Sequence, residues 1–152
     1  MSHSDAKGTR DALIGQLVYF DEQVSSFLDE YSDSARQDRV KLRKLIERYQ
    51  RKLQDVTSRN DDRLDESLRS VVLIGSSVKI EFPEDSIVET YTIAFPEHID
   101  PDQNRISFLS PLGLSLLLGS VADSVTVEGP GGNYVVHVQE VNFAENAVYA
   151  MP

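Results

Sequence analysis

Three carboxylates lie close together in a polar break near the start of the chain, at Asp29, Glu30 and Asp33. Each offers negative charge and oxygen atoms that accept hydrogen bonds. The break separates two segments with helical periodicity, which places the three acids at the far end of a predicted helical hairpin. In an arbitrary hairpin they would be ordinary solvated loop acids. Their role therefore depends on what the rest of the chain positions around them.

A run of cations follows the break. Between positions 36 and 52, eight Lys or Arg residues are opposed only by Asp38 and Glu47. One interpretation is a solvated outer face that pairs with Asp21, Glu22 and other acids of the first helix. The other is a positive strip that attracts a nucleic-acid backbone or an acidic protein surface. The candidate basic strip consists of Arg36, Arg39, Arg43 and Lys44.

Other kinds of site find little support. The chain has no cysteine, which rules out disulfides, a thiol nucleophile and a cysteine zinc site. His98 and His137 stand alone without metal-ligand spacing, and we expect them in a loop and a strand. No apolar stretch is long enough to cross a bilayer, and the polar N-terminus lacks the apolar core of a signal peptide. We therefore expect a cytoplasmic protein without membrane contact.

Apolar spacing predicts the elements that position the acids and the cations. Residues recur at alternating steps of four and three on both sides of the break, which gives each helix one apolar seam. We expect the first helix to begin near Arg10 or Asp11 after a frayed leader over residues 1–10. We expect Ser34 to cap the second. The seam residues are Leu13, Leu17, Phe20, Val24, Phe27 and Tyr31 in the first helix, and Leu42, Leu45, Tyr49, Leu53 and Val56 in the second.

The charge is divided unevenly along the 152 residues, whose net charge is −10. Residues 1–70 carry 13 basic and 14 acidic side chains, whereas residues 71–152 carry 2 and 11. Such a difference supports two units, and it makes nucleic acid an unsuitable partner for the second. We expect an antiparallel coiled-coil hairpin over 1–58, a linker over 59–70 with a helical turn around 62–68, and a second unit over 71–152.

The period changes to two in the second unit, which predicts a small, largely antiparallel sheet covered by one short helix. Ser110 and Pro111 form a helix-start signal, and the apolar run that follows is expected to end at Gly119. A loop is expected over 96–104 and a loose tail over 144–152. The predicted strands are 71–74, 78–82, 87–94 and 105–109, followed by a hairpin of 125–128 and 134–141 around a glycine-rich turn. The fold class is α+β.

Five short stretches of the second unit carry a family resemblance. In order and spacing they resemble the C-terminal domain of the bacterial Gre-type transcript cleavage factors, the GreA/GreB family, over about 70 residues. The resemblance implies a domain related in fold to FK506-binding prolyl isomerases. It also implies a helical hairpin before that domain, which periodicity predicts independently. The stretches are VLIGSSV at 72–78, ETYTI at 89–93, ISFLSPLG at 106–113, LLLG at 116–119 and GPGG at 129–132.

The resemblance gives the acidic break an expected role. In cleavage-competent members, two tip carboxylates help to hold a metal ion and water in the active centre of RNA polymerase, which then hydrolyses its own backtracked RNA. A second magnesium takes hard oxygen ligands, which explains the residue type. By position Asp29 and Asp33 stand for the acidic pair, with Glu30 third. The chain would not be an enzyme and would bind no cofactor tightly, but could share Mg²⁺ with the polymerase.

The resemblance also implies a docking surface. In the family, the C-terminal domain docks on core RNA polymerase at the rim of the secondary channel, near the segment that corresponds to Ser110, Pro111, Leu112, Gly113 and Leu114. Leu112, Leu114 and Leu116 are expected to add exposed apolar area there. The hairpin would point toward the nascent RNA 3′ end, and the protein would act as a monomer.

Three functions stay open. The first is a secondary-channel regulator that stimulates cleavage or competes with factors that do. Each arm of about 20 residues spans roughly 30 Å, which looks short for the family. The chain could therefore be a short-hairpin relative of the Rnk type or a non-cleaving paralogue. The second is an FKBP-like prolyl isomerase, which rests on fold alone. The third is a coiled-coil adaptor without polymerase contact.

Overall fold

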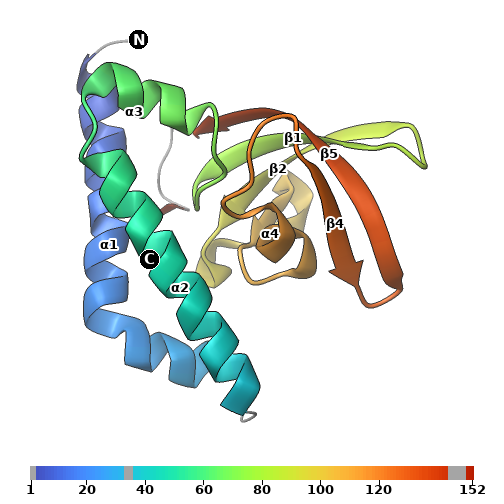
Figure 1. Ribbon diagram of the computed structural model, residues 1–152, viewed down its shortest axis with the longest axis horizontal. Coiled ribbons are helices and arrows are strands. Elements are labelled where there is room, and N and C mark those ends of the chain that lie inside the picture. Colours follow the sequence, from blue (N-terminus) through green and yellow to red (C-terminus); the bar gives the residue numbers. More distant parts are fainter. Residues whose placement is uncertain (1–2, 33–35, 144–149) are drawn as a thin grey trace. The chain divides into compact units, whose positions relative to one another are not determined.

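The computed structural model describes residues 3–32, 36–143 and 150–152, and it forms two compact units, Met1–Leu64 and Asp65–Pro152 (Figure 1). The predictions for Asp33 and for the Ser34 cap fall outside the described residues. The observed class is α+β, as predicted from the sequence.

The first unit is the predicted helical hairpin. Helix α1 runs from His3 to Tyr31 and helix α2 from Arg36 to Thr57, and the two pack against each other. Figure 1 shows that α1 changes direction in its second half, so the hairpin is not a pair of straight rods. A third helix, α3, spans Asp61–Leu68 within the interval that the sequence predicted as a linker with a helical turn.

The predicted leader is wrong, because α1 begins at His3 rather than near Arg10 or Asp11. The first residues carry no apolar period, so a prediction based on periodicity cannot detect the helix there. A tertiary contact helps to hold this end. Arg10 donates to the carbonyl oxygen of Thr57 at the end of α2 and lies 2.9 Å from Asp61 Oδ1 in α3.

The hairpin core is wider than a single seam. Leu13, Phe20 and Phe27 of α1 are buried as predicted, and so are four of the five seam residues of α2. Four further side chains that the sequence analysis did not select are also buried: Ala12, Gln16, Leu28 and Ile46. The half-buried residues of the predicted seam are Leu17, Val24, Tyr31 and Leu45.

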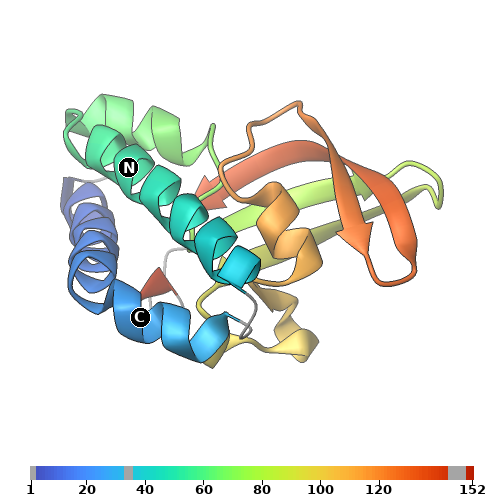
Figure 2. The ribbon, with the colours of Figure 1, turned by 60° about the horizontal axis from the view of Figure 1, so that its bottom comes forward.

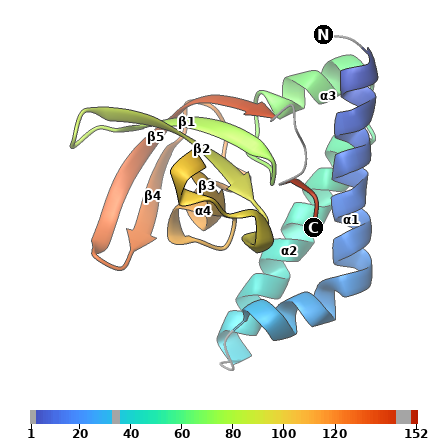
Figure 3. The same cartoon turned by 180° about the vertical axis from the view of Figure 1, so that it is seen from behind.

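The second unit is a curled five-stranded sheet with the order β3-β2-β1-β5-β4 (Figure 2). Figure 3 shows the short strand β3 beside β2 at one edge. The β2–β3 pair is parallel and the others are antiparallel, so the sheet is mixed. The strands are β1 Ser76–Phe82, β2 Ile87–Ala94, β3 Arg105–Ser107, β4 Ser124–Gly129 and β5 Gly132–Phe143.

The predicted strand at 71–74 is not formed. All four residues are buried, but Val71 makes only an isolated bridge to Ser120. Gly75 then turns the chain at φ +108°, where a Cβ would lie 2.6 Å from that of Ala150. A short apolar run signals burial without specifying a strand.

Two loops contain more structure than predicted. The segment after β2 holds two short 3-10 helices, Pro96–His98 and Pro101–Gln103. The chain end is not entirely a loose tail, because Ala150 is fully buried and the Met151 carbonyl oxygen lies 3.0 Å from His98 Nε2. Neither segment is long enough to show a periodic pattern in the sequence, so neither could be predicted from it.

Candidate docking surface and hairpin tip

Helix α4, Pro111–Leu116, begins with the predicted cap. Ser110 Oγ accepts a hydrogen bond from the Gly113 amide at 3.1 Å and donates to the Ser107 carbonyl oxygen at 2.7 Å. Pro111 occupies the first turn, where no amide hydrogen is required. The helix ends before the predicted stop at Gly119, because Leu118 adopts φ +65° and donates its amide to Val72.

Gly113 is buried and allows the chain to pass close to itself. A Cβ at this position would lie 2.1 Å from the Ser107 carbonyl oxygen and 3.0 Å from Phe108 Cα. Both neighbours are backbone atoms, so no side-chain rotation relieves the clash. Of the five residues predicted for docking, Gly113 therefore positions the surface rather than contributing to it.

The exposed part of α4 is apolar. Pro111 is exposed, Leu112 is half-buried, and Leu114 is 43% exposed. Leu116 is completely buried, so the expectation that it adds exposed area is wrong. Leu116 lies one turn after Leu112, on the side of α4 that packs against the core. Pro111, Leu112 and Leu114 together form an apolar surface, which we call the α4 surface.

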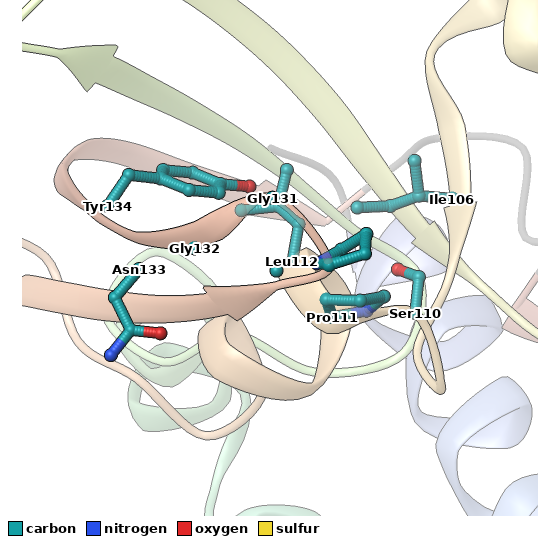
Figure 4. Close-up of a pocket in the computed structure, with 10 residues that line it drawn as sticks. Ile106, Ser110, Pro111, Leu112, Gly131, Gly132, Asn133 and Tyr134 are labelled. Atoms are coloured by element: carbon teal, nitrogen blue, oxygen red, sulfur yellow. The ribbon is translucent and has the colours of Figure 1, made fainter.

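A pocket of about 500 Å³ lies beside the α4 surface (Figure 4). It joins two motifs that the sequence analysis treated separately, the start of α4 and the glycine-rich turn between β4 and β5. Ile106, Tyr134 and Asn133 complete its walls and were not predicted. The only sequence signal for them was their place next to these motifs. The lining residues are Ile106, Ser110, Pro111, Leu112, Gly129, Pro130, Gly131, Gly132, Asn133 and Tyr134.

Aromatic side chains extend from the pocket along the sheet. Phe82 stacks on Tyr134 with ring centroids 6.1 Å apart. Tyr91 donates a short hydrogen bond to Glu89 Oε2. Burial, together with the Glu89 carboxylate and the nearby Tyr134, raises the pKa of Tyr91 to about 12. The phenol of Tyr91 therefore stays protonated throughout the physiological range.

The hairpin tip brings together one residue from each predicted charged set. Arg39 Nη1 lies 2.6 Å from Asp29 Oδ1, which joins the end of α1 to the start of α2. Asp29 and Glu30 lie in the last turn of α1, where helix carbonyls disfavour negative charge. Arg39 offsets that cost. Glu30 is exposed and forms no ion pair with another described residue.

The remainder of the basic strip lies on the outside of α2. Arg43 and Lys44 are exposed, and the Arg36 side chain falls outside the described part of the structure. Pairing with Asp21 and Glu22 is not seen among the described residues. The acids that meet cations of α2 are instead Asp29, and Asp55 within the helix itself.

Two further kinds of site are absent from the described part of the chain. In the described ranges, no group of three His, Cys, Asp or Glu side chains is placed to hold a metal ion. None of the described helices is long and apolar enough to cross a membrane.

Comparison with known proteins agrees with these features. The family model described as "Transcription elongation factor, GreA/GreB, C-term" matches residues 67–143. Transcription elongation factor GreA of Desulfovibrio desulfuricans is 39% identical over 72 residues, 47% of this chain and 44% of the relative. GreA 1 of Lactiplantibacillus plantarum is 36% identical over 118 residues, 76% of this chain and 70% of the relative.

A solved structure of GreA factor homolog 1 (Gfh1) of Thermus thermophilus is 24% identical, with a TM-score of 0.44, over 92% of this chain and 91% of that chain. The matched stretch spans about half the length of the Desulfovibrio relative. The family match covers the whole sheet, α4 and the pocket. By this match and the relative of Lactiplantibacillus, the chain belongs to the GreA/GreB family of transcription elongation factors.

Proposed function

We propose that this chain regulates transcription elongation by binding core RNA polymerase as a monomer. The second unit docks at the rim of the secondary channel, and the hairpin presents its tip toward the channel and the nascent RNA 3′ end. The observation that carries the proposal is the family match over residues 67–143. Relatives that share this stretch are named transcription elongation factors. The chain acts on the polymerase's own RNA hydrolysis and is not itself an enzyme.

The α4 surface supports the docking step. Leu114 and Pro111 are apolar and exposed, on a helix whose cap and close glycine contact fix its position. Apolar side chains held rigidly at a surface lose little entropy when a partner covers them. This favours α4 as the part of the second unit that meets the polymerase.

The tip supports competition rather than stimulation of cleavage. The Asp29 carboxylate is paired with Arg39 at the exposed tip, and a magnesium ion would displace that guanidinium at a cost of about 0–1 kcal/mol. The second arm is also short, since the 22 residues of α2 span roughly 33 Å, whereas α1 has 29 residues rather than the predicted number of about 20 and changes direction in its second half. We therefore propose that the chain occupies the channel and excludes cleavage-stimulating factors.

Substitution of Leu114 by Ser tests the docking step. The change removes exposed apolar area, and burying most of a leucine contributes about 1.5–3 kcal/mol. We therefore expect binding to core polymerase, measured by fluorescence anisotropy of the labelled chain, to weaken about 10-fold or more. Ile99→Ser is the matched control, because Ile99 is an exposed apolar residue of the same unit outside α4. Equal binding by both variants and the parent would remove α4 from the docking surface.

A further inference from the structure

We propose that the pocket beside α4 and the Glu89–Tyr91 pair form one groove that binds a Lys or Arg side chain next to an apolar residue of a protein partner. We call it the cation groove. The inference rests on the proposed function for the identity of the partner, which is RNA polymerase. The chemistry of the groove follows from residues of the second unit alone.

Strand register makes the groove continuous. Tyr91 and Glu89 of β2 lie opposite the buried Val78 and Ile80 of β1, so both belong to the core-bearing face of the sheet. Ile93, two residues from Tyr91 on the same face, is paired with Ile106 of β3. Ile106 lines the pocket. Tyr91 and Glu89 therefore lie on the same face of the sheet as the pocket wall, with the buried Ile93 between Ile106 and Tyr91.

The other side of the groove is aromatic. Tyr134 lines the pocket and stacks on Phe82, which lies opposite Ile87 on the same face of the sheet. Tyr134 is also near enough to Tyr91 to affect its pKa electrostatically. Aromatic faces attract Lys and Arg, and a carboxylate adds charge-assisted hydrogen bonds. Glu89 is exposed at the strand, so an incoming cation can reach it.

The charge of the unit selects a cation over an anion. Residues 71–152 contain 11 acidic side chains and only two basic ones, Lys79 and Arg105. Lys79 alternates with Val78 and Ile80 and so points to the opposite face of the sheet. Arg105 is engaged by the Asp100 carboxylate and the His98 carbonyl oxygen. Neither compensates Glu89, so the groove is left negative.

The apolar end of the groove determines which kind of residue stands next to the Lys or Arg in the partner. Ile106, Pro111, Leu112 and Pro130 supply aliphatic walls beside Tyr134. A leucine-sized side chain would be covered there while the adjacent Lys or Arg extends toward Glu89. The ligand class is therefore a basic and apolar pair of residues in a protein segment, rather than a free anion or a nucleic acid.

A nuclear magnetic resonance titration of the full chain tests the groove without polymerase. The probes are acetyl-Leu-Arg-amide, acetyl-Leu-Gln-amide and acetyl-Leu-Pro-amide, and the observed signals are the amides of Gly131 and Gly132. We expect the Arg probe to shift these signals and to bind more tightly than the Gln probe. Equal affinity for Arg and Gln, or tightest binding of the Pro probe, would overturn the proposal.

Two variants with the same change of net charge test whether Glu89 binds the Arg side chain of the probe. Glu89→Gln keeps an acceptor for Tyr91 but loses the charge, and it should weaken binding of the Arg probe about two- to five-fold, as for an exposed ion pair. Glu140→Gln changes the net charge equally on the opposite face, opposite Lys79, and should leave binding unchanged. Equal effects of the two variants would contradict the assignment of Glu89.

Polymerase binding separates the two proposals. If the full chain binds polymerase but no probe shifts Gly131 and Gly132, the cation groove is wrong and the proposed function stands. If the Arg probe binds as expected but the chain does not bind polymerase, the proposed function is wrong and the groove chemistry stands.

Discussion

Gly113 shows how one residue of the family motif acts through packing. Its missing side chain lets the first turn of α4 approach the Ser107 carbonyl oxygen, which also accepts a bond from Ser110. The position of the α4 surface therefore depends on both Gly113 and the Ser110 cap. A substitution here should disturb the whole α4 surface without removing any group that touches a partner.

Gly113→Ala should accordingly destabilise the second unit. The new methyl group meets two backbone atoms, and overpacking of this kind costs about 1–3 kcal/mol. Urea unfolding measures the loss. Gly131→Ala is the control, since a Cβ there meets nothing within 4 Å, and it should change stability little. Similar losses from both variants would show that the contact at Gly113 relaxes without cost.

Tyr91 makes stability depend on pH in a defined range. Its pKa in the folded chain is raised to about 12 from an ordinary value of 10.0, mainly by burial and then by Glu89. A raised folded pKa means that the contribution is complete below about pH 10 and is lost as pH rises toward 12. Tyr91→Phe has no phenol to ionise, so its unfolding midpoint should fall less steeply over this range. Parallel curves for the two chains would show that Tyr91 titrates normally.

The local chemistry of single residues was the most predictable part of the structure. The Ser110 cap followed from sequence because capping involves only neighbouring residues. The Asp29–Arg39 bond did not, although both residues were selected, because it depends on how the two arms approach each other. The pocket was missed for the same reason, since it joins residues 106, 110–112 and 129–134.

At the scale of elements, the hairpin is held by a buried polar contact inside an aromatic core. Tyr49 donates to Gln16 Oε1 at 2.6 Å, and both side chains are almost completely buried. The Tyr49 ring also meets Phe20 edge-on at 6.0 Å. A directional bond within an apolar seam can fix the register of two helices.

Tyr49→Phe should lower the free energy of unfolding of the hairpin by about 1–3 kcal/mol, because the ring remains but the buried Gln16 Oε1 loses the hydroxyl donor of Tyr49. Gln16→Leu combined with Tyr49→Phe should recover part of the loss, since neither polar group of the pair then stays buried. Chemical unfolding of the four chains forms a double-mutant cycle. Strict additivity would show that the contact does not couple the helices.

Element boundaries were predictable where local signals and tertiary pairing agree. Strand β2 was predicted with the bounds that it has, because turn residues precede it and Pro96 follows. The strand predicted at 71–74 was wrong because four apolar residues can be buried without pairing in a sheet. The predicted start of α1 was wrong because this end of the helix is supported by contacts of Arg10 with residues more than 40 positions away.

At the scale of the whole molecule, the two units have different chemistry. The first half is nearly neutral with cations exposed on α2, and the second is strongly acidic with an apolar surface at α4. In the proposed function the second unit binds and the hairpin occupies the channel. In that proposal the tip occupies the channel without supplying metal ligands, and its Asp29 carboxylate pairs with Arg39.

RNA cleavage in a backtracked elongation complex tests this account most directly. The full chain is added to polymerase with a cleavage-competent GreA factor, and the rate of transcript shortening is followed. We predict that the chain alone gives no stimulation and that rising concentrations slow the GreA-dependent reaction until it reaches the intrinsic rate. Unchanged GreA-dependent cleavage at the highest concentration, or stimulation by the chain alone, would contradict the account.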